Sequence, residues 1–123
     1  MLLADTSVWI EHFRHGNIGL EYPLSSGQVV SHPFIIGELA CGNLKNRSRI
    51  LALLDTLPLA PQAEHEEVMH FIEKFNLMGK GLGYIDAHLL ASAMLASLPL
   101  WTLDKRLNNI AVSLGMKHIR TAP

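Results

Sequence analysis

Residues 1–13, MLLADTSVWIEHF, join a short apolar run to a carboxylate, two hydroxyl side chains and a helical pattern. Residues 2–4 are typical of a short buried strand. Thr6 and Ser7 favour the start of a helix because they are good N-cap residues. Asp5 therefore falls where a strand ends and faces a helix, the place at which open α/β sheets carry functional groups. Taken alone, this aspartate would be interpreted as a helix cap.

The composition limits the class of protein. The chain has 123 residues, of which 49% are hydrophobic and 17% charged, and its net charge is −1. This length suffices for one domain with its own core, so we expect a single domain over residues 1–123. The apolar composition predicts that some surface binds a partner. With so small a net charge, any binding of nucleic acid must come from locally clustered basic residues.

No membrane span or export signal is predicted. The longest apolar run, residues 89–98, is well short of the roughly 20 residues that a span requires and ends at Pro99. The amino terminus lacks a basic region followed by a cleavage site, and the single cysteine, Cys41, cannot form an internal disulfide. We therefore expect a cytoplasmic protein that does not enter a membrane.

The rest of the chain alternates strand patterns with helical ones. Further strands are predicted at residues 28–31, 57–60, 98–103 and 117–120. Further helices are predicted at 18–26, interrupted near Pro23, at 33–42, at 46–57, from Pro61 to Phe75, from Tyr84 onward and at 105–114. Parallel strands need crossover connections, which helices supply, so this alternation predicts a parallel sheet in an α/β sandwich.

Four acidic residues stand out because their neighbours are apolar. Asp5 and Asp104 each follow a predicted strand. Glu38 and Asp86 lie in predicted helices, among apolar residues. If the strands before Asp5 and Asp104 are neighbours where the strand order reverses, both carboxylates face one crevice. Glu38 and Asp86 could reach the same place.

Four converging carboxylates would raise one another's pKa and destabilise the fold unless protons or cations compensate them. An all-oxygen ligand set favours Mg²⁺ or Mn²⁺, whereas zinc prefers histidine and cysteine. The seven histidines show no zinc-binding spacing, so we interpret them as structural or surface residues. Such a site suits phosphodiester hydrolysis, because the metal can activate a water and stabilise charge on phosphate oxygens.

Four segments together resemble the PIN-domain family, and closely its VapC-type toxins. They are LLADTSVWIEHF (2–13), IIGELACGNL (35–44), GYIDAHLLASA (83–93) and LWTLDKRL (100–107). The resemblance covers nearly the whole chain. It implies a three-layer α/β/α domain with a central, mostly parallel sheet. It also implies a Mg²⁺- or Mn²⁺-dependent endoribonuclease that a cognate antitoxin inhibits.

The site residues of the family are carried over by position. The resemblance implies metal-binding and catalytic roles for Asp5, Glu38, Asp86 and Asp104. It implies supporting roles, toward a water or the carboxylates, for Thr6 or Ser7 and for Thr102. Asn108, where the chain departs from the family, could orient a water or a phosphate. Many relatives carry a further acid shortly after the last aspartate, whereas this chain has asparagine at positions 108 and 109. This departure leaves open whether one metal ion or two would bind.

RNA and protein partners are also expected. The basic residues nearest the acids in sequence could contact RNA phosphates or be solvated charges: Lys45, Arg47, Arg49, Lys105 and Arg106. An apolar stripe on the helices at 33–42 and 46–57 could receive an antitoxin segment, although core burial would explain it too. Another face could form a homodimer or larger assembly.

Two other classes of protein remain open. One is a PIN-like module that binds RNA or protein and has lost catalysis, for which the missing fifth acid is the support. The other is a response-regulator-like phosphoacceptor domain, which also gathers carboxylates at strand ends. That site needs an acidic pair after the first strand, whereas here Thr6 and Ser7 follow Asp5.

Overall fold

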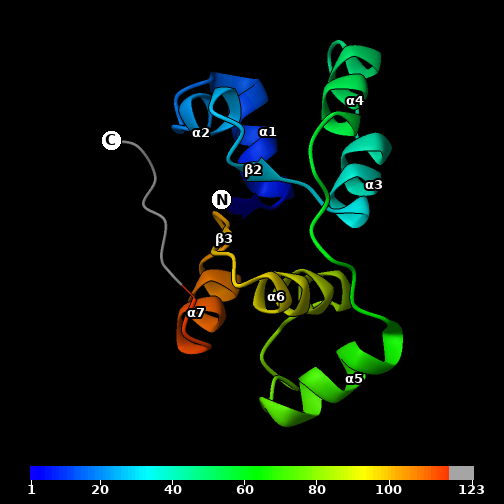
Figure 1. Cartoon of the computed structure of the whole chain (residues 1–123), viewed down its shortest axis with the longest axis vertical. Helices are drawn as coiled ribbons and strands as arrows, with labels where there is room; N and C mark the ends of the chain where they lie inside the picture. The colour runs from blue at the N-terminus through cyan, green and yellow to red at the C-terminus, as the bar shows by residue number, and fades with distance from the viewer. Residues whose placement is uncertain (117–123) are drawn as a thin grey trace.

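A parallel sheet of three short strands lies at the centre of the protein (Figure 1). In the computed structural model, which describes residues 1–116, β1 (Leu2–Ala4) lies between β2 (Val29–Val30) and β3 (Leu100–Trp101). The chain passes from β1 to β2 on one side and later returns to β3 on the other. The strand order therefore reverses at β1, which meets the condition set in the sequence analysis, and the carboxyl ends of β1 and β3 are adjacent.

Seven helices within the described residues surround this sheet. They are α1 (Thr6–His15), α2 (Glu21–Ser25), α3 (Pro33–Cys41), α4 (Arg47–Asp55), α5 (His65–Lys74), α6 (Tyr84–Ala96) and α7 (Lys105–Ser113). Helix α3 contacts both α1 and α4, α5 packs on α6, and α6 and α7 contact β3. None of these helices is long and apolar enough to cross a membrane.

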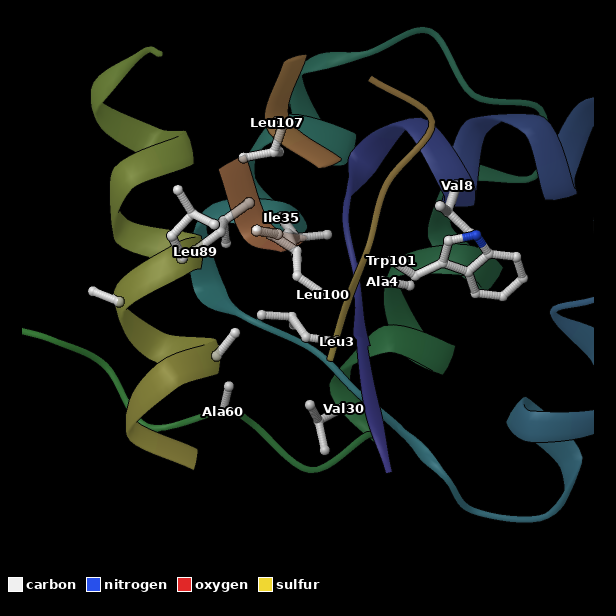
Figure 2. Close-up of a cluster of buried hydrophobic side chains, with 14 of the residues drawn as sticks. Leu3, Ala4, Val8, Val30, Ile35, Ala60, Leu89, Leu100, Trp101 and Leu107 are labelled. Atoms are coloured by element: carbon white, nitrogen blue, oxygen red, sulfur yellow. The ribbon is translucent and has the colours of Figure 1, made fainter. Parts of the chain in front are cut away.

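Both faces of the sheet are buried. Leu3 of β1 and Leu100 of β3 lie with Leu89 of α6 on one face, whereas Trp101 lies on the opposite face near Val8 of α1 (Figure 2). All five side chains are at most 3% exposed. Because both faces are buried, the strand sequences are continuously apolar and do not alternate between apolar and polar residues.

The strands are shorter than the sequence predicts. The expected strand at 57–60 is reduced to one parallel bridge between Ser31 and Leu59. The expected strand at 98–103 pairs only at Leu100 and Trp101, because Thr102 turns its hydroxyl to a carboxylate at the end of β1. The strand predicted at 117–120 lies outside the described residues.

Helix boundaries also differ from the prediction in three places. Helix α5 begins at His65 instead of Pro61, since the Glu64 amide donates to the Glu67 carboxylate at 3.0 Å in a capping box. Pro23 lies inside α2 and does not interrupt it. This is possible because the first turn of a helix does not require the missing amide hydrogen. The cap of α1 is Asp5 rather than Thr6 or Ser7.

Candidate active site

Asp5 combines the cap of a helix with a buried position at the end of β1. Its Oδ1 accepts hydrogen bonds from the Ser7 amide at 3.0 Å and the Val8 amide at 3.4 Å, and also from the Ser7 hydroxyl. Its Oδ2 accepts a bond from the Thr102 hydroxyl at 2.6 Å. Burial raises the pKa of Asp5, and these hydrogen bonds oppose the increase. The cap interpretation is thus correct, but it does not exclude a functional role.

Asp104 repeats this arrangement at the end of the neighbouring strand. Its Oδ1 accepts from the Arg106 amide at 2.9 Å and the Leu107 amide at 3.2 Å, so Asp104 caps α7. Its own amide donates to the Thr102 hydroxyl oxygen at 3.1 Å. Thr102 therefore lies between the two aspartates and is hydrogen-bonded to both.

Two further hydroxyls connect this edge of the sheet to its surroundings. The Ser7 hydroxyl oxygen accepts from the Leu103 amide at 3.0 Å, which fixes the turn between β3 and α7. The Thr6 hydroxyl donates to Glu38 Oε1 at 2.8 Å, which ties α3 to the residue after Asp5. All three predicted supporting hydroxyls thus contact a predicted acid or its adjoining backbone.

Asp86 is joined to the other acids less directly. It lies in the first turn of α6, where its Oδ2 accepts from the Gly83 amide at 3.3 Å. The loop before α6 is in contact with α7, because the Arg106 side chain packs against Gly81. This contact joins the segments before Asp86 and after Asp104, and within residues 1–116 no hydrogen bond joins the two carboxylates.

The chemistry of these four acids suits a hard cation. All four supply carboxylate oxygens, and Asp5 is only 7% exposed. Within residues 1–116 none of these four acids forms an ion pair with a lysine, arginine or histidine. The ion pair found in that part of the chain joins His15 to Glu11. The same part of the chain contains no group of three or more histidine, cysteine or acidic side chains arranged to hold a metal ion. The oxygen donors are present, but their side chains would have to converge to bind one ion together.

The five predicted RNA-binding residues do not gather in one patch. Arg47 donates to the Ala40 carbonyl at 3.1 and 3.0 Å, at the end of α3. Lys45 and Arg49 line a groove of about 750 Å³ between α1 and the α3–α4 connection, and none of the four acids lines it. Arg106 packs on Gly81, and Lys105 is exposed in the first turn of α7.

Sequence reasoning missed an aromatic pocket beside Glu38. The pocket lies between α3 and the start of α6, and Phe34 and Tyr84 are among its lining residues. The sequence does place an aromatic residue about one helical turn before each of two predicted acids. Phe34 lies four residues before Glu38, and Tyr84 lies two residues before Asp86.

Two buried histidines lie behind this pocket. His32 is fully buried, and its Nδ1 accepts from the Phe34 amide at 3.0 Å, which caps α3. Burial and the neighbouring His88 lower the pKa of His32 to about 4. Burial also lowers the pKa of His88. Both rings are therefore neutral at pH 7, which agrees with the structural role predicted for them.

Three comparisons bear on the family. The sequence profile of the PIN domain matches residues 2–113. Two relatives, each named Ribonuclease VapC32, come from Mycobacterium tuberculosis strains CDC 1551 / Oshkosh and ATCC 25618 / H37Rv, and each is 42% identical over 94% of this chain and 94% of its own length. A crystal structure of PAE2754 from Pyrobaculum aerophilum, 18% identical, superimposes with a TM-score of 0.64 over 93% of this chain and 94% of that one. The profile and the structural likeness confirm the three-layer α/β/α fold.

Proposed function

Because this chain belongs to the PIN-domain family and is a homologue of VapC ribonucleases, we propose that it is an endoribonuclease that acts as the toxin of a toxin–antitoxin pair. The observation that carries the proposal is the linked pair of aspartates at the ends of β1 and β3, in a chain 42% identical over 94% of its length to Ribonuclease VapC32. The proposal replaces the phosphoacceptor alternative, which the family match does not support.

The four acids are proposed to hold Mg²⁺ or Mn²⁺. A bound cation would supply an activated water and compensate charge on the phosphate, and the nucleophile would be that water. Asp5 contributes a carboxylate whose direction is fixed by the Ser7 and Thr102 hydroxyls. Thr6 holds Glu38 toward this edge, and the cap of α7 orients Asp104. Burial raises the pKa of Asp5, and a bound cation would favour its ionised form.

Asn108 is proposed to assist these acids. Its amide donates to the Asp104 carbonyl at 2.9 Å, which places it one helical turn after the aspartate. In that position its side chain could orient a water or a phosphate. Lys105 and Arg106, in the first turn of the same helix, are the basic residues best placed to contact the RNA backbone. Lys45, Arg47 and Arg49 would contact a more distant part of the RNA.

The proposed protein partner is a cognate antitoxin. The groove of about 750 Å³ beside α1 has apolar lining from Ile10, Phe13 and Ile50, and basic lining from Arg14 and Arg49. An inhibitory segment with apolar and acidic side chains would suit it. A basic side chain of that inhibitor could also enter among the four carboxylates and displace the metal.

Self-association is proposed to use a different face. A pocket of about 420 Å³ between α5 and α6 is lined by apolar side chains that include Phe71, Phe75, Met94 and Leu95. Met69 and Leu95 on these helices are 47% and 57% exposed. A homodimer or larger assembly would bury this surface. Each chain is proposed to form a single domain over residues 1–123, and the proposed location is the cytoplasm.

The test is cleavage of total RNA by the purified chain in Mg²⁺, in Mn²⁺ and in EDTA, with the new 5′ ends mapped by sequencing. We expect a small set of metal-dependent cleavage sites. The second candidate is a PIN-like module without catalysis, which is favoured by the asparagines at positions 108 and 109 in place of a further acid. Intact RNA under both metals would support that candidate and reject the ribonuclease.

A further inference from the structure

The aromatic pocket beside Glu38 has a volume of about 530 Å³. Phe34, Gly37 and Glu38 line it from α3, and Tyr84 lines it from the first turn of α6. Apart from Glu38, its lining carries no charged side chain. Glu38 also accepts the hydrogen bond from Thr6, the residue after Asp5, so the pocket opens beside the proposed active site.

Tyr84 presents a fixed aromatic surface to this pocket. Its hydroxyl is hydrogen-bonded to Nδ1 of His65 over 2.6 Å, and its ring stands nearly perpendicular to the His88 ring, with centroids 4.5 Å apart. The side chain is nevertheless 45% exposed. The His88 ring also packs edge-on against Phe34, with centroids 4.8 Å apart. Both aromatic rings are therefore held in place, and binding against them would cost little side-chain entropy.

Gly37 provides a second, independent indication that the pocket is a binding site. It lies at the centre of α3, where glycine destabilises a helix relative to alanine. Its backbone is helical and has no positive φ. No described atom outside the nearby backbone of α3 lies within 4 Å of the Cβ that another residue would add there. Neither the local backbone nor the packing of the described residues requires glycine, so its effect is to keep the pocket open.

We propose that this pocket holds one unpaired nucleobase of the RNA substrate, stacked against Tyr84, while the adjoining phosphate lies at the four acids. The inference rests on the proposed ribonuclease function and adds a position at which the enzyme contacts a base. Sequence-selective binding of RNA commonly splays out a base and stacks it on an aromatic side chain. Inside the pocket, with no cation beside it, a phosphate would be repelled by Glu38, whereas a neutral, flat base fits the apolar, aromatic lining.

The test compares substitutions that fill the pocket or remove its aromatic face. The probe is a fluorescein-labelled, single-stranded 12-nucleotide RNA of random sequence, and its binding is measured by fluorescence anisotropy in EDTA, so that no cleavage occurs. Gly37→Leu should fill the pocket and Tyr84→Leu should remove the stacking surface, and each should weaken binding about tenfold. Tyr22→Leu, which alters a tyrosine 75% exposed on α2, is the control and should bind as wild type does.

A second probe separates the base from the backbone. A 12-nucleotide strand with ribose and phosphate but no bases should bind the wild type more weakly, and Gly37→Leu and Tyr84→Leu should not weaken it further. Thermal melting of each variant checks the fold, and Gly37→Leu should melt no lower than wild type because leucine favours the helix.

The outcomes distinguish this inference from the function on which it rests. Wild-type affinity for the base-containing RNA in both Gly37→Leu and Tyr84→Leu would overturn the base pocket even if the wild type cleaves RNA. Gly37→Leu could instead cleave RNA and bind it normally but resist inhibition by the antitoxin. That result would overturn the base pocket and would assign the pocket to a side chain of the antitoxin. Failure of the wild type to cleave RNA in either metal would reject the ribonuclease, whatever the binding results.

Discussion

Asp5 and Asp104 are joined through a single hydroxyl group. Thr102 donates to Asp5 Oδ2 at 2.6 Å, and the Asp104 amide donates to the Thr102 hydroxyl oxygen at 3.1 Å. The link spans two neighbouring parallel strands at their carboxyl ends. A change in any of the three residues is therefore expected to affect the other two.

The charge of the two aspartates is predicted to be essential for cleavage and dispensable for folding. Asp5→Asn and Asp104→Asn should abolish metal-dependent cleavage of RNA. Asparagine is as good a helix cap as aspartate, and at position 5 it removes a buried charge, so the free energy of unfolding should be unchanged or higher. Asp55→Asn, at the exposed end of α4, is the control. Full activity in both variants would refute the site; Glu38→Gln and Asp86→Asn extend the same test.

Thr102 is predicted to hold the aspartates in position. Thr102→Val keeps the shape of the side chain but leaves Asp5 Oδ2 and the Asp104 amide without their partner. We expect a loss of about 1–3 kcal/mol in the free energy of unfolding and a loss of about 10- to 100-fold in cleavage. Thr102→Ser should restore most of both. Chemical denaturation and cleavage of a labelled RNA measure the two effects, and a valine variant with wild-type activity would remove Thr102 from the mechanism.

Two glycines with similar positive φ angles offer a matched test of the contact between α7 and the loop before α6. Gly79 has φ +73° and no described atom near an added Cβ, whereas Gly81 has φ +78° and lies against the Arg106 side chain. Gly79→Ala should cost about 1–2 kcal/mol from backbone strain alone. Gly81→Ala should cost the same strain plus a small extra amount, because the flexible end of the Arg106 side chain must move away from the added Cβ.

The excess cost is attributed to Arg106. Shortening this side chain with Arg106→Ala in the Gly81→Ala background should recover the difference between the two glycine variants, as measured by urea denaturation in a double-mutant cycle. Equal stability of Gly79→Ala and Gly81→Ala would show that the contact has no energetic consequence.

His32 is predicted to destabilise the fold in mild acid. Its folded pKa of about 4 lies below the ordinary value of 6.5, so the unfolded chain binds a proton first as the pH falls. The stability associated with this group is present above pH 6.5 and is lost progressively between pH 6.5 and 4, by about 2–3 kcal/mol. His32→Asn keeps an acceptor at the cap of α3 and does not titrate, so it should lose less stability over this range than wild type does. Parallel slopes for the two proteins, measured by denaturation at several pH values, would contradict the assignment.

Lys105 is predicted to contact an RNA phosphate. Lys105→Ala should weaken RNA binding in EDTA and reduce the slope of log affinity against log salt by about 0.7, the value for one contact to a single strand. Lys74→Ala, at the end of α5, should leave that slope unchanged. An unaltered slope in Lys105→Ala would exclude this residue from phosphate binding.

The sequence predicts the edge of the sheet that carries Asp5 and Asp104 because its signals are local. An apolar run that ends at a carboxylate marks both β1 with Asp5 and β3 with Asp104. The parallel order follows from the helices between the strands. Strand lengths were overestimated, since pairing depends on distant partners: Ser31 bonds to the backbone around Leu59, but only over one bridge.

The aromatic pocket could not be derived from local pattern. Its lining comes from α3 and from the start of α6, which are far apart in the chain, and its Tyr84 is hydrogen-bonded to His65, 19 residues earlier. The same holds for the contact of Gly81 with Arg106, which lies on another helix. Such features need the tertiary arrangement, because no property of either residue alone predicts its partner.

Asp5 and Asp104 cap helices in addition to their proposed role in binding metal. This combination predicts which inactivating mutations would be recovered at the two positions. A cell that escapes a harmful enzyme by mutation can alter either aspartate, but the replacements are not equivalent. Alanine would remove the cap together with the charge, and the weakened chain would be open to proteolysis. Asparagine would leave a folded but inert copy, still able to occupy its inhibitor. Among surviving alleles that still produce intact protein, asparagine should therefore predominate at these two positions.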